Sequence, residues 1–200
     1  MAGKSIGVLS LASGGRYNTI TVLESNGLKE EDVTLVATGP VPTAFLEDQV
    51  DVWMTLTTTE VSLRAQGIEM NSFPVSDYAN LPTDVFAMNR SDFDDEEKRA
   101  VALRFLRAIK RGTEFMIGDP QAAAEISINH GLDITELEPA ITRIEAFGVA
   151  SQSAGTTANG LGWFDLDVLQ EGADLYFASG VITKGINVAD YFTNDLVTQL

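Results

Sequence analysis

Short apolar runs alternate with stretches of helical periodicity along the first seventy residues. The apolar runs are residues 5–9, 33–37 and 50–56, and they are predicted to be buried strands. The helical stretches between and after them are 17–24, 42–49 and 58–66. This βαβαβα order predicts an α/β unit with parallel strands. A further apolar segment follows at 68–75, and residues 84–89 are predicted to form one more strand.

After residue 90 the pattern becomes almost entirely helical. Residues 94–116 carry acidic side chains in the first turn, basic ones later and apolar ones along one face. This arrangement is typical of a long amphipathic helix whose charges complement its dipole. Further helices are predicted at 120–130, 134–147, 165–179 and 188–199, with a Gly-rich loop at 148–163. These amphipathic helices have no sheet of their own to cover.

Composition excludes several classes of function. The chain has 29 acidic and 13 basic residues among 200, a net charge of −16, which argues against nucleic acid or an anionic membrane as partner. It has no Cys, so disulfides, Cys-ligated zinc, Fe–S clusters and thiol catalysis are excluded. No run approaches the roughly 18–20 apolar residues of a membrane span, and no signal peptide is evident.

Catalytic and metal motifs are also absent from the sequence. There is no P-loop, nucleophile elbow, HExxH or paired-carboxylate spacing, and the single His130 fits the end of a predicted helix as a favourable cation. The acidic stretch 92–97 lacks the spacing of an EF-hand and fits a helix N-terminus. We therefore expect no cofactor, no metal site and no enzyme.

The turn after the first predicted strand is the leading candidate site. Ser10, Ser13, Gly14 and Gly15 lie where this strand is followed by a helix. Free N–H groups at a helix N-terminus bind anions or polar ligands, and Gly lets a ligand approach the backbone closely. Arg16 follows and can pair with a carboxylate, sulfonate or phosphate. From the residues alone, an ordinary helix cap with a solvent-facing Arg is the commoner arrangement.

Four other residues are weaker candidates for ligand contacts. Thr55 and Thr57 offer hydroxyl groups in the segment 53–59, at the end of the predicted 50–56 strand and just after it, where helix capping is an alternative role. Asp77 can bind an amine or cap a local turn, and Trp163 can close over a ligand or pack beneath the next helix. Trp53, inside the predicted strand, is interpreted as a core residue.

Several phrases of the sequence resemble one protein family in the same order. They are GKSIGVLSLASGG, ESNGLKEEDVTLV, LEDQVDVWM, KRAVALRFLRAIKRGTEFMIGDPQAAAEI and VADYFTNDLV. Together they are similar to the nitrate/sulfonate/taurine-type periplasmic binding proteins of ABC transporters, a superfamily that includes thiamine-pyrimidine binders and related pyrimidine-synthesis proteins. The resemblance runs over nearly the whole chain.

The resemblance implies a type II binding-protein fold, in which an α/β lobe has a mixed, mostly parallel sheet with helices on both faces. Residues 3–88 would be the complete second lobe, and 89–200 the helices of the first lobe, whose early strands would be absent from a truncated chain. Either the missing first-lobe segment or self-association would then cover the apolar helix faces. The protein would be periplasmic or lipid-anchored outside the inner membrane.

The resemblance also implies a function. The protein would be the solute-binding component of an ABC importer, capturing a small polar or anionic organic molecule in an inter-lobe cleft without chemistry. Sulfonate, nitrate and pyrimidine-like solutes fit this class, and a membrane permease would be the partner. Family members use the turn at 10–15 for ligand, whereas a Trp-Glu-Pro-like trio of the family falls on Leu56, Thr57 and Thr58, so a Glu that faces a cationic ligand is lacking.

Three alternatives remain at this point. A pyrimidine-synthesis-type enzyme of the same fold would use a Cys-rich motif and a reactive His, and neither is present. An effector-sensing domain of a transcription regulator would carry a helix-turn-helix segment, which is not found. A truncated chain that binds nothing stays open.

Overall fold

The computed structural model describes residues 1–78, 84–131 and 136–200, which form an α/β structure with a short parallel sheet. The chain divides into two compact units. The sheet unit comprises Met1–Leu56, Asn71–Asp84 and Leu166–Tyr191, and the helical unit comprises Thr57–Met70, Val85–Asp165 and Phe192–Leu200. The division into lobes at 3–88 and 89–200 stays a prediction.

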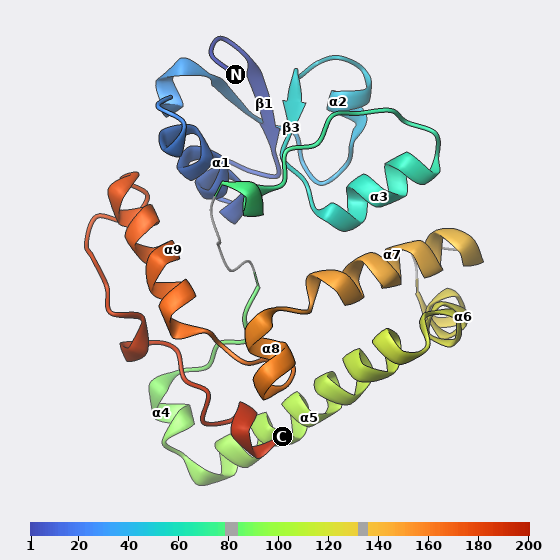
Figure 1. Ribbon diagram of the computed structural model, residues 1–200, viewed down its shortest axis with the longest axis vertical. Coiled ribbons are helices and arrows are strands. Elements are labelled where there is room, and N and C mark those ends of the chain that lie inside the picture. Colours follow the sequence, from blue (N-terminus) through green and yellow to red (C-terminus); the bar gives the residue numbers. More distant parts are fainter. Residues whose placement is uncertain (79–83, 132–135) are drawn as a thin grey trace. The chain divides into compact units, whose positions relative to one another are not determined.

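Three parallel strands form the core of the sheet unit (Figure 1). They are β1 (Ser5–Val8), β2 (Thr34–Ala37) and β3 (Val52–Trp53), in the order β2-β1-β3. Ile6 of the central strand pairs with Leu35 on one side and Val52 on the other. Ile6 and Val8 are almost fully buried, because a parallel strand between two neighbours is covered by the connecting helices. The predicted parallel α/β unit is confirmed.

Helix α1 (Gly14–Ser25) connects β1 to β2 and buries Ile20 and Leu23. Helix α9 (Leu166–Ala178) packs beside it, as Figure 1 shows. The two helices share polar contacts, since Tyr176 Oη donates to Asn18 Oδ1 at 2.5 Å and Thr21 Oγ1 lies 3.3 Å from Ser179 Oγ. Burial raises the pKa of Tyr176, which keeps its hydroxyl a neutral donor. The remaining short elements are α2 (Thr43–Leu46), η1 (Glu30–Asp32), η2 (Val75–Asp77) and η3 (Val188–Asp190).

The helical unit is built around α5 (Glu96–Gly118), α6 (Pro120–His130) and α7 (Leu137–Ala150). The carboxylates of Asp95 and Asp119 cap α5 and α6 by accepting from the backbone N–H of Lys98 and Ala122. The unit also contains α3 (Thr57–Ala65), α4 (Arg90–Phe93), α8 (Ala154–Asn159) and η4 (Val197–Gln199). The predicted helices at 94–116 and 120–130 are confirmed, and the predicted start of the 134–147 helix lies partly outside the described residues.

Three predicted elements are wrong. Residues 84–89 form no strand. The predicted loop 148–163 contains α8, because Ser153 and Thr156 form a capping box that starts a short helix. Residues 188–199 are two short 3-10 turns instead of one helix. The Asn194 side chain bonds both the N–H and the carbonyl of Phe164, which fixes the non-helical segment between these turns.

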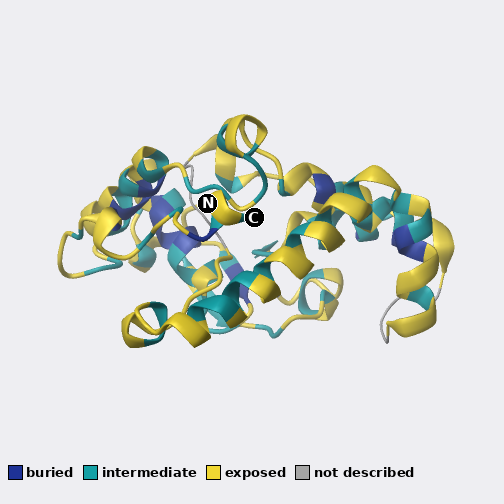
Figure 2. Cartoon of the chain, turned by 90° about the horizontal axis from the view of Figure 1, so that it is seen from below, coloured by how far each residue is buried: buried dark blue, intermediate teal, exposed yellow. Residues whose placement is uncertain are grey.

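Buried residues are few and fall in small groups (Figure 2). The apolar face of α5 is instead largely exposed, with Val101 at 55%, Phe105 at 49% and Ile109 at 40% of their full exposure. These side chains form an exposed apolar face on α5. Whether a first-lobe segment or a second copy covers it stays a prediction.

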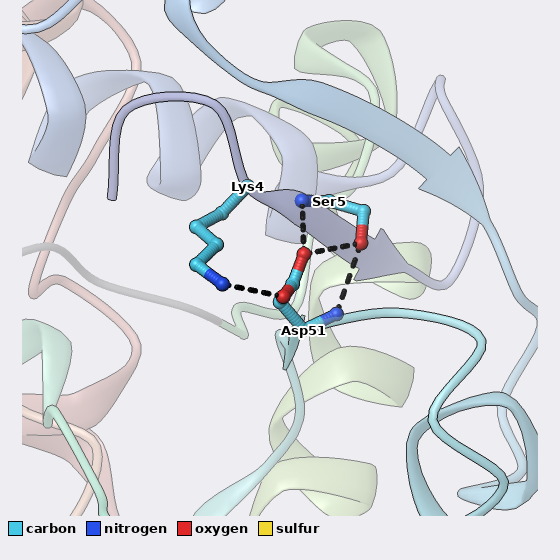
Figure 3. A network of polar contacts seen from close by, with 3 residues as sticks. All are labelled: Lys4, Ser5 and Asp51. Carbon is cyan, nitrogen blue, oxygen red and sulfur yellow. Dashed lines mark hydrogen bonds and ion pairs between the residues drawn. The ribbon is translucent and has the colours of Figure 1, made fainter.

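A polar network fixes the amino edge of the sheet (Figure 3). Both the backbone N–H and the hydroxyl of Ser5 donate to Asp51 Oδ2 at 2.8 Å, and Lys4 Nζ donates to Asp51 Oδ1 at 2.8 Å. Asp51 N–H in turn donates to Ser5 Oγ at 3.0 Å. The start of β1 is thereby tied to the residue before β3. The hydrogen bonds from Lys4 and Ser5 hold the pKa of Asp51 well below its usual range.

Because the folded pKa of Asp51 is depressed, its contribution to stability is fully present above the unfolded pKa of about 3.9. It is lost as the pH falls from about 4 towards the lower folded pKa. We expect Asp51→Asn to be less stable than the wild type at pH 7 and this difference to shrink at pH 2.5. Urea unfolding at both pH values measures it, with Glu31→Gln, in an exposed pair 3.9 Å from Lys29, as the control. An equal difference at both pH values would contradict the assigned role.

Candidate functional site

The carboxyl ends of all three strands lie at one edge of the sheet, because the strands are parallel. Three connections leave this edge within the sheet unit: residues 9–13 after β1, 38–42 after β2 and 54–56 after β3. Ligands of open α/β sheets bind outside the carboxyl ends of the strands. The edge therefore positions the predicted Ser10–Arg16 turn where a ligand can reach it.

Two serines hold the shape of this turn. Ser13 occupies the N-cap position of α1 with an extended backbone, but its side chain does not cap the helix. Its hydroxyl donates instead to the carbonyl of Ser10 at 2.7 Å, and Ala12 N–H donates to Ser10 Oγ at 3.3 Å. The side chains that could have satisfied the helix N-terminus are thus used within the turn.

Gly14 and Gly15 leave two backbone donors open. Within the described part of the chain, neither N–H has a hydrogen-bond acceptor. A Cβ built on Gly14 would meet no atom within 4 Å, and one on Gly15 would lie 3.4 Å from Met54 Cγ in the connection after β3. The first turn of α1 therefore presents N–H groups with the partial positive charge of a helix N-terminus to an open space.

Arg16, in the first turn of α1, is paired with Glu30. Its Nε lies 3.1 Å from Glu30 Oε1, and its Nη2 lies 2.7 and 2.8 Å from the two carboxylate oxygens. The Arg16 side chain is only 25% exposed, and its guanidinium stands 5.5 Å from the centroid of the Tyr17 ring. A shallow, open hollow runs beside this pair, lined also by Leu11 and by residues 33–35. Whether Arg16 contacts a ligand stays a prediction.

Gly7 and Trp53 lie at the end of the sheet next to this edge. A Cβ on Gly7 would stand 2.9 Å from Thr38 Cγ2 and 3.1 Å from Trp53 Cδ1, so these side chains close directly over the central strand. Trp53 Nε1 is buried, and no described residue provides an acceptor for it. The sequence interpretation of Trp53 as a core residue missed this donor. No sequence signal reveals it, because an indole N–H lacks a partner only through its tertiary neighbours.

Exposed apolar side chains surround the same edge. Each of the three connections carries at least one of them: Leu9 and Leu11 after β1, Val41 after β2 and Leu56 after β3. All four are more than half exposed. Donors of the backbone together with apolar side chains suit an organic solute that has both hydrogen-bond acceptors and an apolar part.

The other predicted site residues are dispersed. Thr55 is half-buried in the connection after β3, and Asp77 is exposed at the end of η2, both in the sheet unit. Thr57 begins α3 and Trp163 packs near Gly155 of α8, both in the helical unit. Among the described residues, no hydrogen bond joins any of these four to the Ser10–Gly15 turn. Their roles as ligand contacts stay predictions.

Comparison with known families decides the classification. The model of the family described as NMT1/THI5 like matches residues 1–123, more than half of the chain. The chain belongs to the NMT1/THI5-like family. The family resemblance inferred from the sequence phrases and the binding-protein type of α/β fold are both confirmed.

A curated relative of this NMT1/THI5-like chain is the riboflavin-binding protein RibY of Chloroflexus aurantiacus. The two are 25% identical over 201 residues, an alignment that takes in 98% of this chain and 57% of the relative. The chain thus spans little more than half the length of that protein. Family and relative together support a solute-binding role in general and point to a binding protein instead of an enzyme.

No group of three or more His, Cys, Asp or Glu side chains in residues 1–78, 84–131 and 136–200 is placed to hold a metal ion. Over the same ranges, none of the helices has the length and apolar character needed to cross a bilayer.

Proposed function

We propose that this chain is the solute-binding component of an ABC importer. It captures a small organic solute at the carboxyl edge of its parallel sheet and delivers it unchanged to a permease in the membrane. The observation that carries the proposal is the pair of N–H groups at Gly14 and Gly15. They have no acceptor among the described residues, and they lie in a turn held by Ser10 and Ser13. Membership of the NMT1/THI5-like family supports it.

The geometry suggests how the solute is held. An acceptor atom of the solute, such as a ring carbonyl oxygen, accepts hydrogen bonds from the two N–H groups at the start of α1. The helix dipole strengthens these hydrogen bonds. The apolar side chains of Leu11 and Leu56 lie on connections from the same edge and can cover an apolar ring. None of this requires a nucleophile or a general base, in agreement with binding and release without chemistry. The proposal places the protein in the periplasm or lipid-anchored outside the inner membrane.

A thermal-shift screen of the chain tests the proposal. The panel contains riboflavin, because a relative is named for it, together with pyrimidines, taurine, an alkyl sulfonate and nitrate. A solute present at a hundred times its Kd should raise the free energy of unfolding by about 2.7 kcal/mol and Tm by several degrees. Mass spectrometry should recover that solute unchanged.

The control is Asp51→Asn, whose altered side chain lies at the opposite, amino edge of the sheet. It should bind the same solute with the affinity of the wild type. The proposed function is wrong if no member of the panel stabilises the chain, or if the solute is converted.

A further inference from the structure

In the first turn of α1, Arg16 forms an ion pair with Glu30. It lies two positions after Gly14, in the first turn of the helix whose N–H groups are open. Glu30 engages the guanidinium through three contacts of 2.7 to 3.1 Å that use both carboxylate oxygens. The basic residue closest in sequence to the open donors is therefore already paired in this structure.

This pairing determines the charge that the turn presents to a solute. An arginine bound to both oxygens of a carboxylate forms a pair with no net charge, so it attracts an anionic solute only weakly. The carboxylate also repels a second anion. Glu30 is itself 43% exposed, so its charge faces the shallow hollow beside Arg16. The net charge of −16 adds a long-range repulsion of the same sign.

We propose that Glu30 is a specificity-determining residue that occupies Arg16 and thereby excludes anionic solutes from the turn. The solute that the chain takes is then uncharged and bears hydrogen-bond acceptors. This inference rests on the proposed function, and it selects among the polar and anionic solutes that the family resemblance leaves open.

A purely structural role for the Arg16–Glu30 ion pair predicts a different effect of its loss on solute preference. The ion pair joins the first turn of α1 to η1, the turn before β2, so its loss would lower stability in any case. A structural role would leave the preference between a charged and an uncharged solute unchanged. The preference is therefore the decisive measurement.

Benzenesulfonate and benzenesulfonamide form a matched probe pair, because they have nearly the same shape and differ in charge. Their affinities are measured by NMR titration for the wild type, Glu30→Gln, the double variant Arg16→Gln/Glu30→Gln, and the control Glu31→Gln. Circular dichroism checks that each variant is folded, and Glu30→Ala is a second variant that frees Arg16.

We expect the wild type to bind the sulfonamide at least as tightly as the sulfonate. Glu30→Gln should bind the sulfonate about tenfold more tightly than the wild type does, since a guanidinium freed of its carboxylate makes strong charge-assisted hydrogen bonds. Its affinity for the sulfonamide should stay the same. The double variant should lose the gain, and Glu31→Gln should show none.

Two results would overturn the inference: a wild type that prefers the sulfonate, or a Glu30→Gln variant without increased sulfonate affinity. The proposed function is tested separately by the solute panel. A wild type that binds an uncharged solute while Glu30→Gln gains no sulfonate affinity overturns only the role of Glu30. A wild type that binds no solute of the panel overturns the proposed function.

Discussion

Replacing Gly7 by valine should lower the free energy of unfolding of the sheet unit by about 3 kcal/mol, the upper end of the range for overpacked cores. Gly7 lies in the central strand, between Ile6 and Val8, where the backbone is bonded on both sides. A Cβ at this position would already stand 2.9 Å from Thr38 Cγ2 and 3.1 Å from Trp53 Cδ1. Valine adds two methyl groups in the same space, so the side chains of Thr38 and Trp53 must move. This displacement disturbs the packing next to the carboxyl edge of the sheet.

Tryptophan fluorescence can follow this unit alone. The chain has two tryptophans, Trp53 in the sheet unit and Trp163 in the helical unit. In a Trp163→Phe background, urea unfolding monitored at Trp53 reports the sheet unit. Gly14→Ala is the matched control, because its Cβ would meet nothing within 4 Å, and it should change stability by less than about 0.5 kcal/mol. A Gly7→Val variant as stable as this control would show that the packing over β1 is not as described.

The second large effect concerns binding. Gly14→Pro should weaken the affinity for the captured solute about thirtyfold relative to Gly14→Ala, which corresponds to roughly 2 kcal/mol for an acceptor left without its donor. Proline removes the N–H and places its ring where the acceptor of the solute would lie. Gly14 is the first residue of α1, where proline is favoured, and Ser13 before it already has the extended backbone that a following proline requires.

Helix α1 should therefore persist in both variants, and circular dichroism with the melting temperature verifies this. The affinities are measured by calorimetry with the solute that gives the largest thermal shift. Equal affinities of Gly14→Pro and Gly14→Ala would show that this N–H does not bind the solute.

Much of the fold follows from local signals in the sequence. The apolar runs at 5–9, 33–37 and 50–56 predict the three strands, since parallel strands buried on both faces are continuously apolar. The long helix α5 is predicted by its periodicity and by acidic residues in its first turn. In both cases residues near in sequence determine the structure.

The failures arise where tertiary contacts decide. Residues 84–89 have an apolar pattern but no strand partner in the described structure, and a strand without a partner leaves its backbone groups unpaired. Residues 188–199 have helical periodicity, yet the Asn194 side chain binds Phe164, which is distant in sequence. Local periodicity contains no information on either contact.

The turn after β1 that carries the candidate site is predicted from the sequence, and its role in binding stays a prediction. A Ser-Gly-Gly turn after the first strand is enough to predict open N–H groups at the start of α1. Two features depend on residues that only the fold brings near: the ion pair between Arg16 and Glu30, and the buried N–H of Trp53. In our proposal, the ion pair narrows the expected solute from a polar or anionic molecule to an uncharged one.

An NMR titration of the ¹⁵N-labelled chain with the solute that stabilises it most tests directly whether the N–H groups of Gly14 and Gly15 bind the solute. We expect the amide signals of Gly14 and Gly15 to shift most and to saturate with the Kd found by calorimetry, while the signal of the Ser5 amide at the amino edge stays unchanged. Unchanged Gly14 and Gly15 signals, with saturating shifts elsewhere, would contradict this expectation.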